Sequence, residues 1–168
     1  QHAAACGMVK TVMIVGGQRK NLPFFWLAEF PGTERGKMYC QINAGGLYGL
    51  QSYVAQVEVD ISKGLPCFDM VGLLDSEVRE ARERLRVSLH HINAALPAEK
   101  ITVNYSPAGI VKSGTSFDLP TALVILAAQG KVPPERLREL WAVGEVGLDA
   151  RIKQVRGVLA MLHAANQS

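Results

Sequence analysis

The sequence contains little cysteine and no long apolar run, and each shortage excludes a class of protein. Its three cysteines, Cys6, Cys40 and Cys67, are odd in number and widely spaced, with no C-x-x-C pair among 168 residues. That pattern indicates reduced thiols and excludes a disulfide frame or a cysteine-based zinc site. No apolar run approaches the roughly 20 residues of a membrane helix. The run at residues 12–15 is too short for a signal peptide, so we expect a cytoplasmic protein.

The sequence also lacks an excess of charge after residue 37. Residues 1–37 hold five Lys and Arg against two Asp and Glu, whereas residues 38–168 hold thirteen of each. A neutral body argues against a broad nucleic-acid-binding face. Residues 1–37 have no steady hydrophobic period either, and strand patterns begin directly after Met38. We therefore expect 1–37 to be a non-native or disordered extension and 38–168 to form the domain; a genuine N-terminal segment is the alternative.

Regular patterns after Met38 mix strands with helices. Periodicity and turn residues predict strands at 40–44, 53–61, 67–71, 101–105 and 141–143. A turn is expected at 45–49, a hairpin-like turn at 62–64, and a hairpin at 144–152 with its turn near 149–150. Helices are expected from Asp75 or Ser76 to about Asn93, from Ser116 or Phe117 to Gly130, at 135–140, and from Gly157 onward. The chain stops inside this last helix, at Ser168, so we expect it to be a piece of a longer protein.

The first predicted helix carries four arginines and ends in two histidines. Arg79, Arg82, Arg84 and Arg86 alternate with acidic residues, which favours a solvated face of i,i+4 pairs over a phosphate site. The adjacent histidines, His90 and His91, point in different directions on a helix. They are therefore predicted to cap the helix end and not to share a metal.

A hydroxyl-rich glycine turn, residues 112–120, joins a strand to an apolar helix. Backbone N–H groups and the positive end of the helix dipole lie beside such a turn and suit an anion or oxyanion. Gly114 permits the turn, Asp118 adds a negative charge, and Pro120 falls in the first helical turn, where its missing N–H is harmless. Ser116 could then belong to a phosphate loop, act as a nucleophile, or cap the helix.

Two of these interpretations lack a residue that they need. Gly109 and Gly114 have the spacing of a phosphate loop, but Thr115 stands where the lysine belongs. A serine–lysine hydrolase requires a neutral lysine to take the proton of Ser116. Gly-Thr-Ser at 114–116, followed by Gly144, Glu145 and Gly157, resembles the proteolytic domain of Lon proteases. In that resemblance Leu159 occupies the lysine position, and leucine accepts no proton. Ser116 is then a vestigial nucleophile, and a Lon-like serine–lysine peptidase remains the alternative function.

A broader resemblance covers nearly all of residues 38–168. Its motifs are Gly64-Leu65-Pro66, the helix at 76–86, Lys100-Ile101-Thr102-Val103-Asn104, and the turn at 113–120. In this order they resemble the N-terminal domain of ComM/YifB proteins, which are magnesium chelatase-related AAA+ ATPases. One departure is Leu74, where that family usually has proline. The family motif residues in this chain are Gly114, Thr115, Ser116, Asp118, Pro120, Gly144, Glu145 and Gly157.

The resemblance implies an α+β fold of the ribosomal protein S5 domain 2-like type, the fold of the Lon proteolytic domain. It also implies a C-terminal AAA+ domain that binds ATP and Mg²⁺, homo-hexameric assembly, and a role in DNA branch migration during natural transformation. Because Ser116 lacks a base, we predict that this domain is non-catalytic. We accordingly expect no catalytic, cofactor or metal residue in 38–168. Ser116 reverts to a helix N-cap that accepts a backbone N–H. Whether DNA touches this domain is left open.

Overall fold

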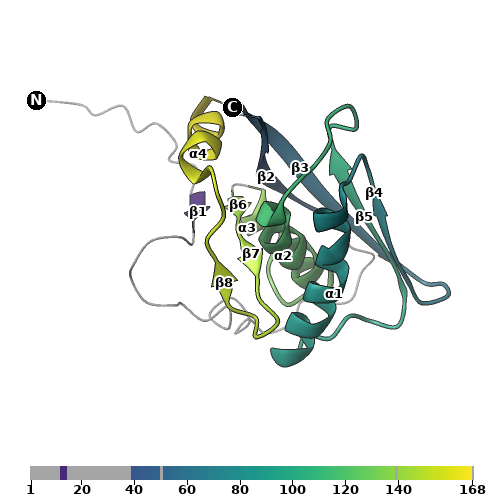
Figure 1. Cartoon of the computed structure of the whole chain (residues 1–168). Coiled ribbons are helices and arrows are strands. Elements are labelled where there is room, and N and C mark those ends of the chain that lie inside the picture. Colours follow the sequence, from purple (N-terminus) through teal and green to yellow (C-terminus); the bar gives the residue numbers. More distant parts are fainter. Residues whose placement is uncertain (1–11, 15–38, 50, 139, 168) are drawn as a thin grey trace, which may run out of the picture.

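The computed structural model describes residues 12–14, 39–49, 51–138 and 140–167, which form an α+β fold (Figure 1). The expected fold class is thus confirmed at the level of a mixed sheet with packed helices. The strands are β1 (Val12–Ile14), β2 (Cys40–Tyr48), β3 (Gln51–Ser62), β4 (Cys67–Val71), β5 (Lys100–Ser106), β6 (Trp141–Val143), β7 (Glu145–Val146) and β8 (Ile152–Lys153). The helices are α1 (Ser76–His91), η2 (Thr115–Phe117, 3₁₀), α2 (Asp118–Ala128), α3 (Pro134–Leu137) and α4 (Val158–Gln167).

Within the described ranges, six strands form one sheet in the order β1-β6-β2-β3-β5-β4, and β7 and β8 form a separate hairpin. β2, β3 and β5 are antiparallel, whereas β4 pairs parallel with β5, and β6 pairs parallel with β2 and β1. Except for Val12–Ile14, the predicted extension at 1–37 lies outside the described residues. Its non-native origin stays a prediction.

Two turn predictions are wrong. β2 continues through Gly45 and Gly46 to Tyr48. These glycines serve close packing, because a Cβ at Gly46 would lie 2.3 Å from Cζ of Tyr53 and one at Gly45 would lie 2.9 Å from Cβ of Met161. The turn at 62–64 does not close a hairpin, since β5 lies between β3 and β4. β4 instead pairs parallel with β5 after the α1 crossover.

Helices cover both faces of the sheet. α2 is buried on every side from Asp118 to Ala127, which explains why its sequence shows no polar face. α1 begins where Asp75 Oδ1 accepts the Val78 N–H at 2.9 Å, as predicted, and its apolar stripe joins the same core. α4 packs on the opposite face, because Met161 contacts Gly45, which alternates with the core residue Ala44 along β2. Among the described residues, no helix has the length and apolarity to cross a membrane.

Candidate functional site

The start of α2 brings together most of the predicted motif residues. Lys112 forms a parallel bridge with Leu74 at the end of the β4–α1 loop. The chain then turns at Gly114, whose φ of 80° lies in the left-handed region that favours glycine. The 3₁₀ turn η2 follows and leads directly into α2. Thr115, Ser116 and Asp118 are thereby set against the segment that joins β6 to β7.

Ser116 donates a hydrogen bond to the sheet and does not cap the helix. Its Oγ lies 3.2 Å from the carbonyl oxygen of Gly45, and the residue is 4% exposed. The capping residue of α2 is Phe117, which makes no side-chain cap bond. The prediction that Ser116 accepts a helix N–H is therefore wrong. The 3₁₀ turn places the start of α2 at Asp118 and directs the serine side chain toward β2.

The residue at the lysine position of the peptidase interpretation is exposed, whereas that hydroxyl is buried. Leu159 sits in the first turn of α4 and is 82% exposed. Lys112 is buried, and its Nζ donates to the carbonyl oxygens of Ile110, at 2.9 Å, and Pro107. Burial lowers the pKa of Lys112, as a general base would need. Its ammonium, however, donates to the backbone of its own loop and not to Ser116. In the described part of the chain, the hydroxyl of Ser116 has its bond to Gly45 and none to an ammonium group.

Gly144 fastens the β6–β7 junction to the start of α2. Pro120 has no N–H, so the carbonyl of Ser116 lacks its usual helical donor. The Gly144 N–H supplies that donor at 3.1 Å, and the Gly144 carbonyl accepts the Leu119 N–H at 3.0 Å. A Cβ at Gly144 would lie 3.0 Å from Cγ2 of Ile152 and 3.2 Å from Cδ2 of Leu119. Gly144 thus supplies the hydrogen-bond donor that Pro120 lacks.

Asp118 and Arg84 form a buried ion pair that joins α2 to α1. The Asp118 Oδ2 accepts from Arg84 Nε at 2.7 Å and from the Val146 N–H at 3.3 Å, and Oδ1 accepts from Arg84 Nη2 at 3.0 Å. The Asp118 side chain is 1% exposed and that of Arg84 is 20% exposed. Burial raises the pKa of Asp118, while the guanidinium opposes the rise; the hydrogen bond to Asp118 in turn raises the pKa of Arg84.

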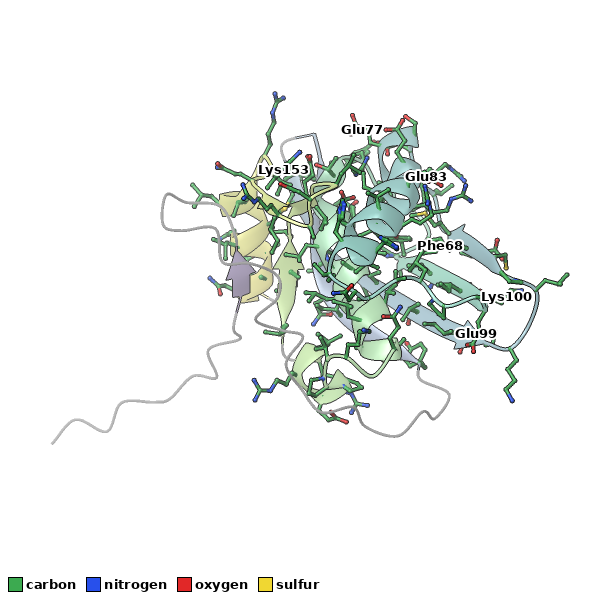
Figure 2. The ribbon with its side chains drawn as sticks, turned by 90° about the horizontal axis from the view of Figure 1, so that it is seen from below. Phe68, Glu77, Glu83, Glu99, Lys100 and Lys153 are labelled. Atoms are coloured by element: carbon green, nitrogen blue, oxygen red, sulfur yellow. The ribbon has the colours of Figure 1, made fainter. Side chains whose placement is uncertain are left out.

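The prediction of a solvated face is right for Arg82 and Arg86 and wrong for Arg84, although Glu80 lies 3.8 Å from its Nη1 at the expected i,i+4 spacing. Arg82 and Arg86 are exposed and pair with Glu83 at 3.5 and 2.9 Å. Glu83 projects outward from α1 (Figure 2). One signal in the sequence could have revealed the difference. Asp118 opens an otherwise apolar buried helix, and a carboxylate in such a place needs a cation.

Glu145, the first residue of β7, connects the β7–β8 hairpin to Thr115 at the start of η2. Its Oε2 accepts the Thr115 hydroxyl at 2.9 Å, and its Oε1 lies 3.4 Å from Lys153 Nζ. At the other end of the hairpin, the His91 Nδ1 lies 2.6 Å from the Leu148 carbonyl oxygen. His91, the last residue of α1, thus contacts the neighbouring hairpin, and that its side chain caps the helix stays a prediction. Among the described residues, no group of His, Cys, Asp and Glu is arranged to hold a metal ion.

The same contacts disfavour a phosphate loop. The Leu119 N–H is taken by Gly144, and the Lys112 ammonium faces carbonyl oxygens. Asp118 and Glu145 place two carboxylates beside the start of α2, where a phosphate would be repelled. What remains is a helix start whose polar groups are satisfied by protein. The fold and site together define an α+β domain in which Asp118 joins α2 to α1, and Asp118 and Thr115 join the start of α2 to the β7–β8 hairpin.

Comparison with known proteins identifies the family. The family described as subunit ChlI of Mg-chelatase matches residues 57–168. The chain is 38% identical over 120 residues to Competence protein ComM of Haemophilus influenzae and 39% identical over 120 residues to the uncharacterized protein YifB of Escherichia coli. It is 38% identical over 119 residues to the uncharacterized protein Rv2897c of Mycobacterium tuberculosis. The chain therefore belongs to the Mg-chelatase ChlI-related family and, within it, to the ComM/YifB group, as the motifs predicted.

The matches cover 71% of this chain but only 24% of each of these three relatives. The chain thus spans about a quarter of the length of its curated relatives.

Replacing Lys112 with methionine tests whether its ammonium stabilises the loop. The carbonyls of Pro107 and Ile110 would lose their charged donor, so we expect the free energy of unfolding to fall by about 1–3 kcal/mol. The matched control is Lys153→Met, which removes an exposed pair with Glu145 and should change stability by less than about 0.5 kcal/mol. Urea denaturation followed by circular dichroism measures both. Equal effects of the two substitutions would contradict a stabilising role for Lys112.

Proposed function

We propose that this chain is a non-catalytic accessory domain of a magnesium chelatase-related AAA+ ATPase. The observation that carries the proposal is the use of the Ser116 hydroxyl, which donates to the Gly45 carbonyl, while the exposed Leu159 occupies the lysine position. A nucleophilic serine needs an adjacent base to take its proton. Here the proton of that hydroxyl points to a backbone carbonyl, and the surrounding motif residues serve packing.

We propose further that the fold is of the S5 domain 2-like type found in the Lon proteolytic domain. The mixed sheet, the buried α2 behind a Gly-Thr-Ser turn, and the β7–β8 hairpin leading into α4 support this assignment. A fold by itself does not supply chemistry. The same scaffold can hold a serine–lysine pair or, as proposed here, a serine without its lysine.

For the whole protein, we propose ATP and Mg²⁺ binding in the region of the relatives that this chain does not cover. We also propose a homo-hexamer that works in the cytoplasm and drives DNA branch migration during natural transformation. The name of the Haemophilus relative, Competence protein ComM, supports the last point. The accessory domain would contribute a stable body for ring assembly or for positioning a partner, because its motif residues tie three elements together.

A fluorophosphonate probe tests the non-catalytic assignment directly. We expect no covalent labelling of Ser116 in the wild-type chain, since its hydroxyl donates to the Gly45 carbonyl and no described residue takes up its proton. Intact-mass and peptide mass spectrometry would measure the label, with a known serine hydrolase as the positive control. Labelling of Ser116 that disappears in Ser116→Ala would overturn the proposal in favour of a Lon-like peptidase.

Substituting Ser116 by alanine should affect stability and spare activity. Loss of the bond to Gly45 is expected to lower the free energy of unfolding by about 1 kcal/mol. In the full-length protein, the same substitution should leave ATP hydrolysis and branch migration within about twofold of wild type, because the hydroxyl takes part in no reaction. A loss of either activity in a folded, assembled Ser116→Ala protein would contradict the accessory role.

A further inference from the structure

We propose that β4 is an interface strand through which two copies of this chain associate, pairing antiparallel about a two-fold axis at Phe68. β4 is the last strand of the sheet at the end opposite β1, and among the described residues its outer edge pairs with no strand (Figure 1). Such an edge presents backbone N–H and C=O groups that a second strand satisfies. This contact is isologous, whereas the contacts of a closed ring are head-to-tail, so the inference does not depend on the proposed function.

Apolar side chains are exposed along this edge. Leu65, which precedes β4, is 88% exposed, and Val71 and Leu73 are each 50% exposed. Phe68 and Met70 lie on the core face of β4 but are only half-buried. Pairing about Phe68 places this side chain opposite its own copy and brings Val71 beside Leu65 of the second copy. The dimer thereby removes apolar surface of both copies from water.

The charges on the outer face of β4 are complementary under this two-fold axis. Cys67 and Asp69 lie on that face, and Lys100 of β5 is the register partner of Cys67. Among the ion pairs of the described residues, none contains Asp69 or Lys100. Pairing about Phe68 sets Asp69 opposite Cys67 of the second copy, with Lys100 of that copy one strand further. Two strand spacings are about 10 Å, which an aspartate and a lysine side chain together can bridge.

Other registers lack this complementarity. An axis at Asp69 would set two carboxylates directly opposite each other, which destabilises a sheet. An axis at Cys67 would set Asp69 opposite the apolar Leu65. A charge on an edge strand commonly prevents pairing. Here the charge of Asp69 selects the register, because only pairing about Phe68 directs it toward Lys100 of the second copy.

Sedimentation equilibrium of the full 1–168 chain tests the association. We expect a monomer–dimer equilibrium for wild type. Asp69→Lys and Lys100→Asp each bring like charges together across the interface, so each should raise the dimer dissociation constant by roughly tenfold or more. The double variant exchanges the two charges and should restore dimerisation. A wild-type chain that stays monomeric up to about 1 mM, or a double variant as weak as the single variants, would overturn the proposal.

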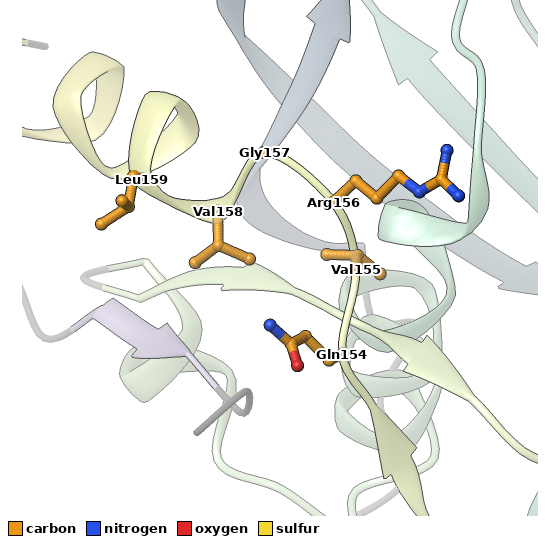
Figure 3. A pocket seen from close by; sticks show the side chains of 6 residues that line it. All are labelled: Gln154, Val155, Arg156, Gly157, Val158 and Leu159. Atoms are coloured by element: carbon orange, nitrogen blue, oxygen red, sulfur yellow. The ribbon is translucent and has the colours of Figure 1, made fainter. Parts of the chain in front are cut away.

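The hollow at the start of α4 provides the matched control for apolar association. Residues 154–159 line a volume of about 480 Å³ there, and Val158 and Leu159 border it (Figure 3). Leu159 is 82% exposed, close to the value of Leu65, but it lies on a helix, which offers no free strand edge. Leu65→Gln should weaken the dimer several-fold, whereas Leu159→Gln should leave it unchanged. Equal effects of the two substitutions would overturn the assignment to β4.

Disulfide formation at the axis tests the register. Pairing about Phe68 holds the two Cα atoms of this residue about 4.5–5.5 Å apart, within the reach of a disulfide. At a concentration where it sediments as a dimer, Phe68→Cys combined with Cys67→Ser should form a covalent dimer on mild oxidation. Wild-type Cys67 should not, because it lies two residues out of line with its own copy. A wild-type dimer linked through Cys67, identified by peptide mass spectrometry, or an unlinked Phe68→Cys dimer would overturn the proposed pairing.

Discussion

Replacing Arg84 with methionine is expected to lower the free energy of unfolding by about 3–5 kcal/mol, because it leaves a buried carboxylate without its cation. Asp118 would lose both guanidinium donors and keep only the Val146 N–H. Methionine preserves much of the length and apolar stem of arginine, so the change isolates the charge. Urea denaturation followed by circular dichroism gives the difference from wild type.

The loss should also depend on pH. Burial raises the pKa of Asp118, and Arg84 opposes that rise, so removing Arg84 raises the pKa further. A carboxyl whose pKa is raised by folding contributes stability below its unfolded pKa of about 3.9, and this contribution is lost as pH rises through the folded pKa. The deficit of Arg84→Met relative to wild type is therefore expected to be larger at pH 8 than at pH 5.

Two further variants make this prediction falsifiable. Arg86→Met removes an exposed arginine of the same helix that pairs with Glu83, and it should change stability by less than about 0.5 kcal/mol. The double variant Arg84→Met with Asp118→Leu removes both charges and should recover part of the loss, with no pH dependence from this site. An Arg84→Met deficit below 1 kcal/mol, or one equal at the two pH values, would contradict a buried ion pair.

Replacing Phe117 with alanine is the second large expected effect, a loss of about 3–5 kcal/mol. Phe117 is the last residue of η2 and is fully buried, and its ring meets that of Tyr105 edge to face, with centroids 6.0 Å apart. Alanine would leave a cavity in the core next to η2 and would remove the aromatic contact with Tyr105. Thermal and urea unfolding measure the loss.

Phe117→Leu is the matched control, because leucine fills more of the space and should lose considerably less stability. Hydrogen exchange at Leu119 and Gly144 adds a local readout, because the Leu119 N–H donates to the Gly144 carbonyl and the Gly144 N–H donates to the carbonyl of Ser116, the residue before Phe117. Faster exchange at these amides is expected in Phe117→Ala. Equal stabilities of the alanine and leucine variants would show that the ring does not support the turn.

The sequence by itself determined the local elements of this domain. The stripe of Val78, Ala81 and Leu85 defined α1, and the uninterrupted apolar run after Pro120 defined α2. Gly147 to Arg151 defined the turn of the β7–β8 hairpin, where Ala150 adopts a φ of 60°. Linked motifs were specific enough to identify the family. Each of these signals arises from residues within a few positions of one another, where period and turn chemistry act directly.

Tertiary structure alone decided how distant residues meet. β5 inserts between β3 and β4, and Gly45 lies in a strand against Met161. Ser116 donates to the Gly45 carbonyl, and Arg84 pairs with the buried Asp118. The Arg84–Asp118 contact joins residues 34 positions apart, and the Ser116–Gly45 contact joins residues 71 positions apart. Local propensity carries no information on such partners, because the free energy that selects them comes from burial and from satisfying polar groups in the assembled core.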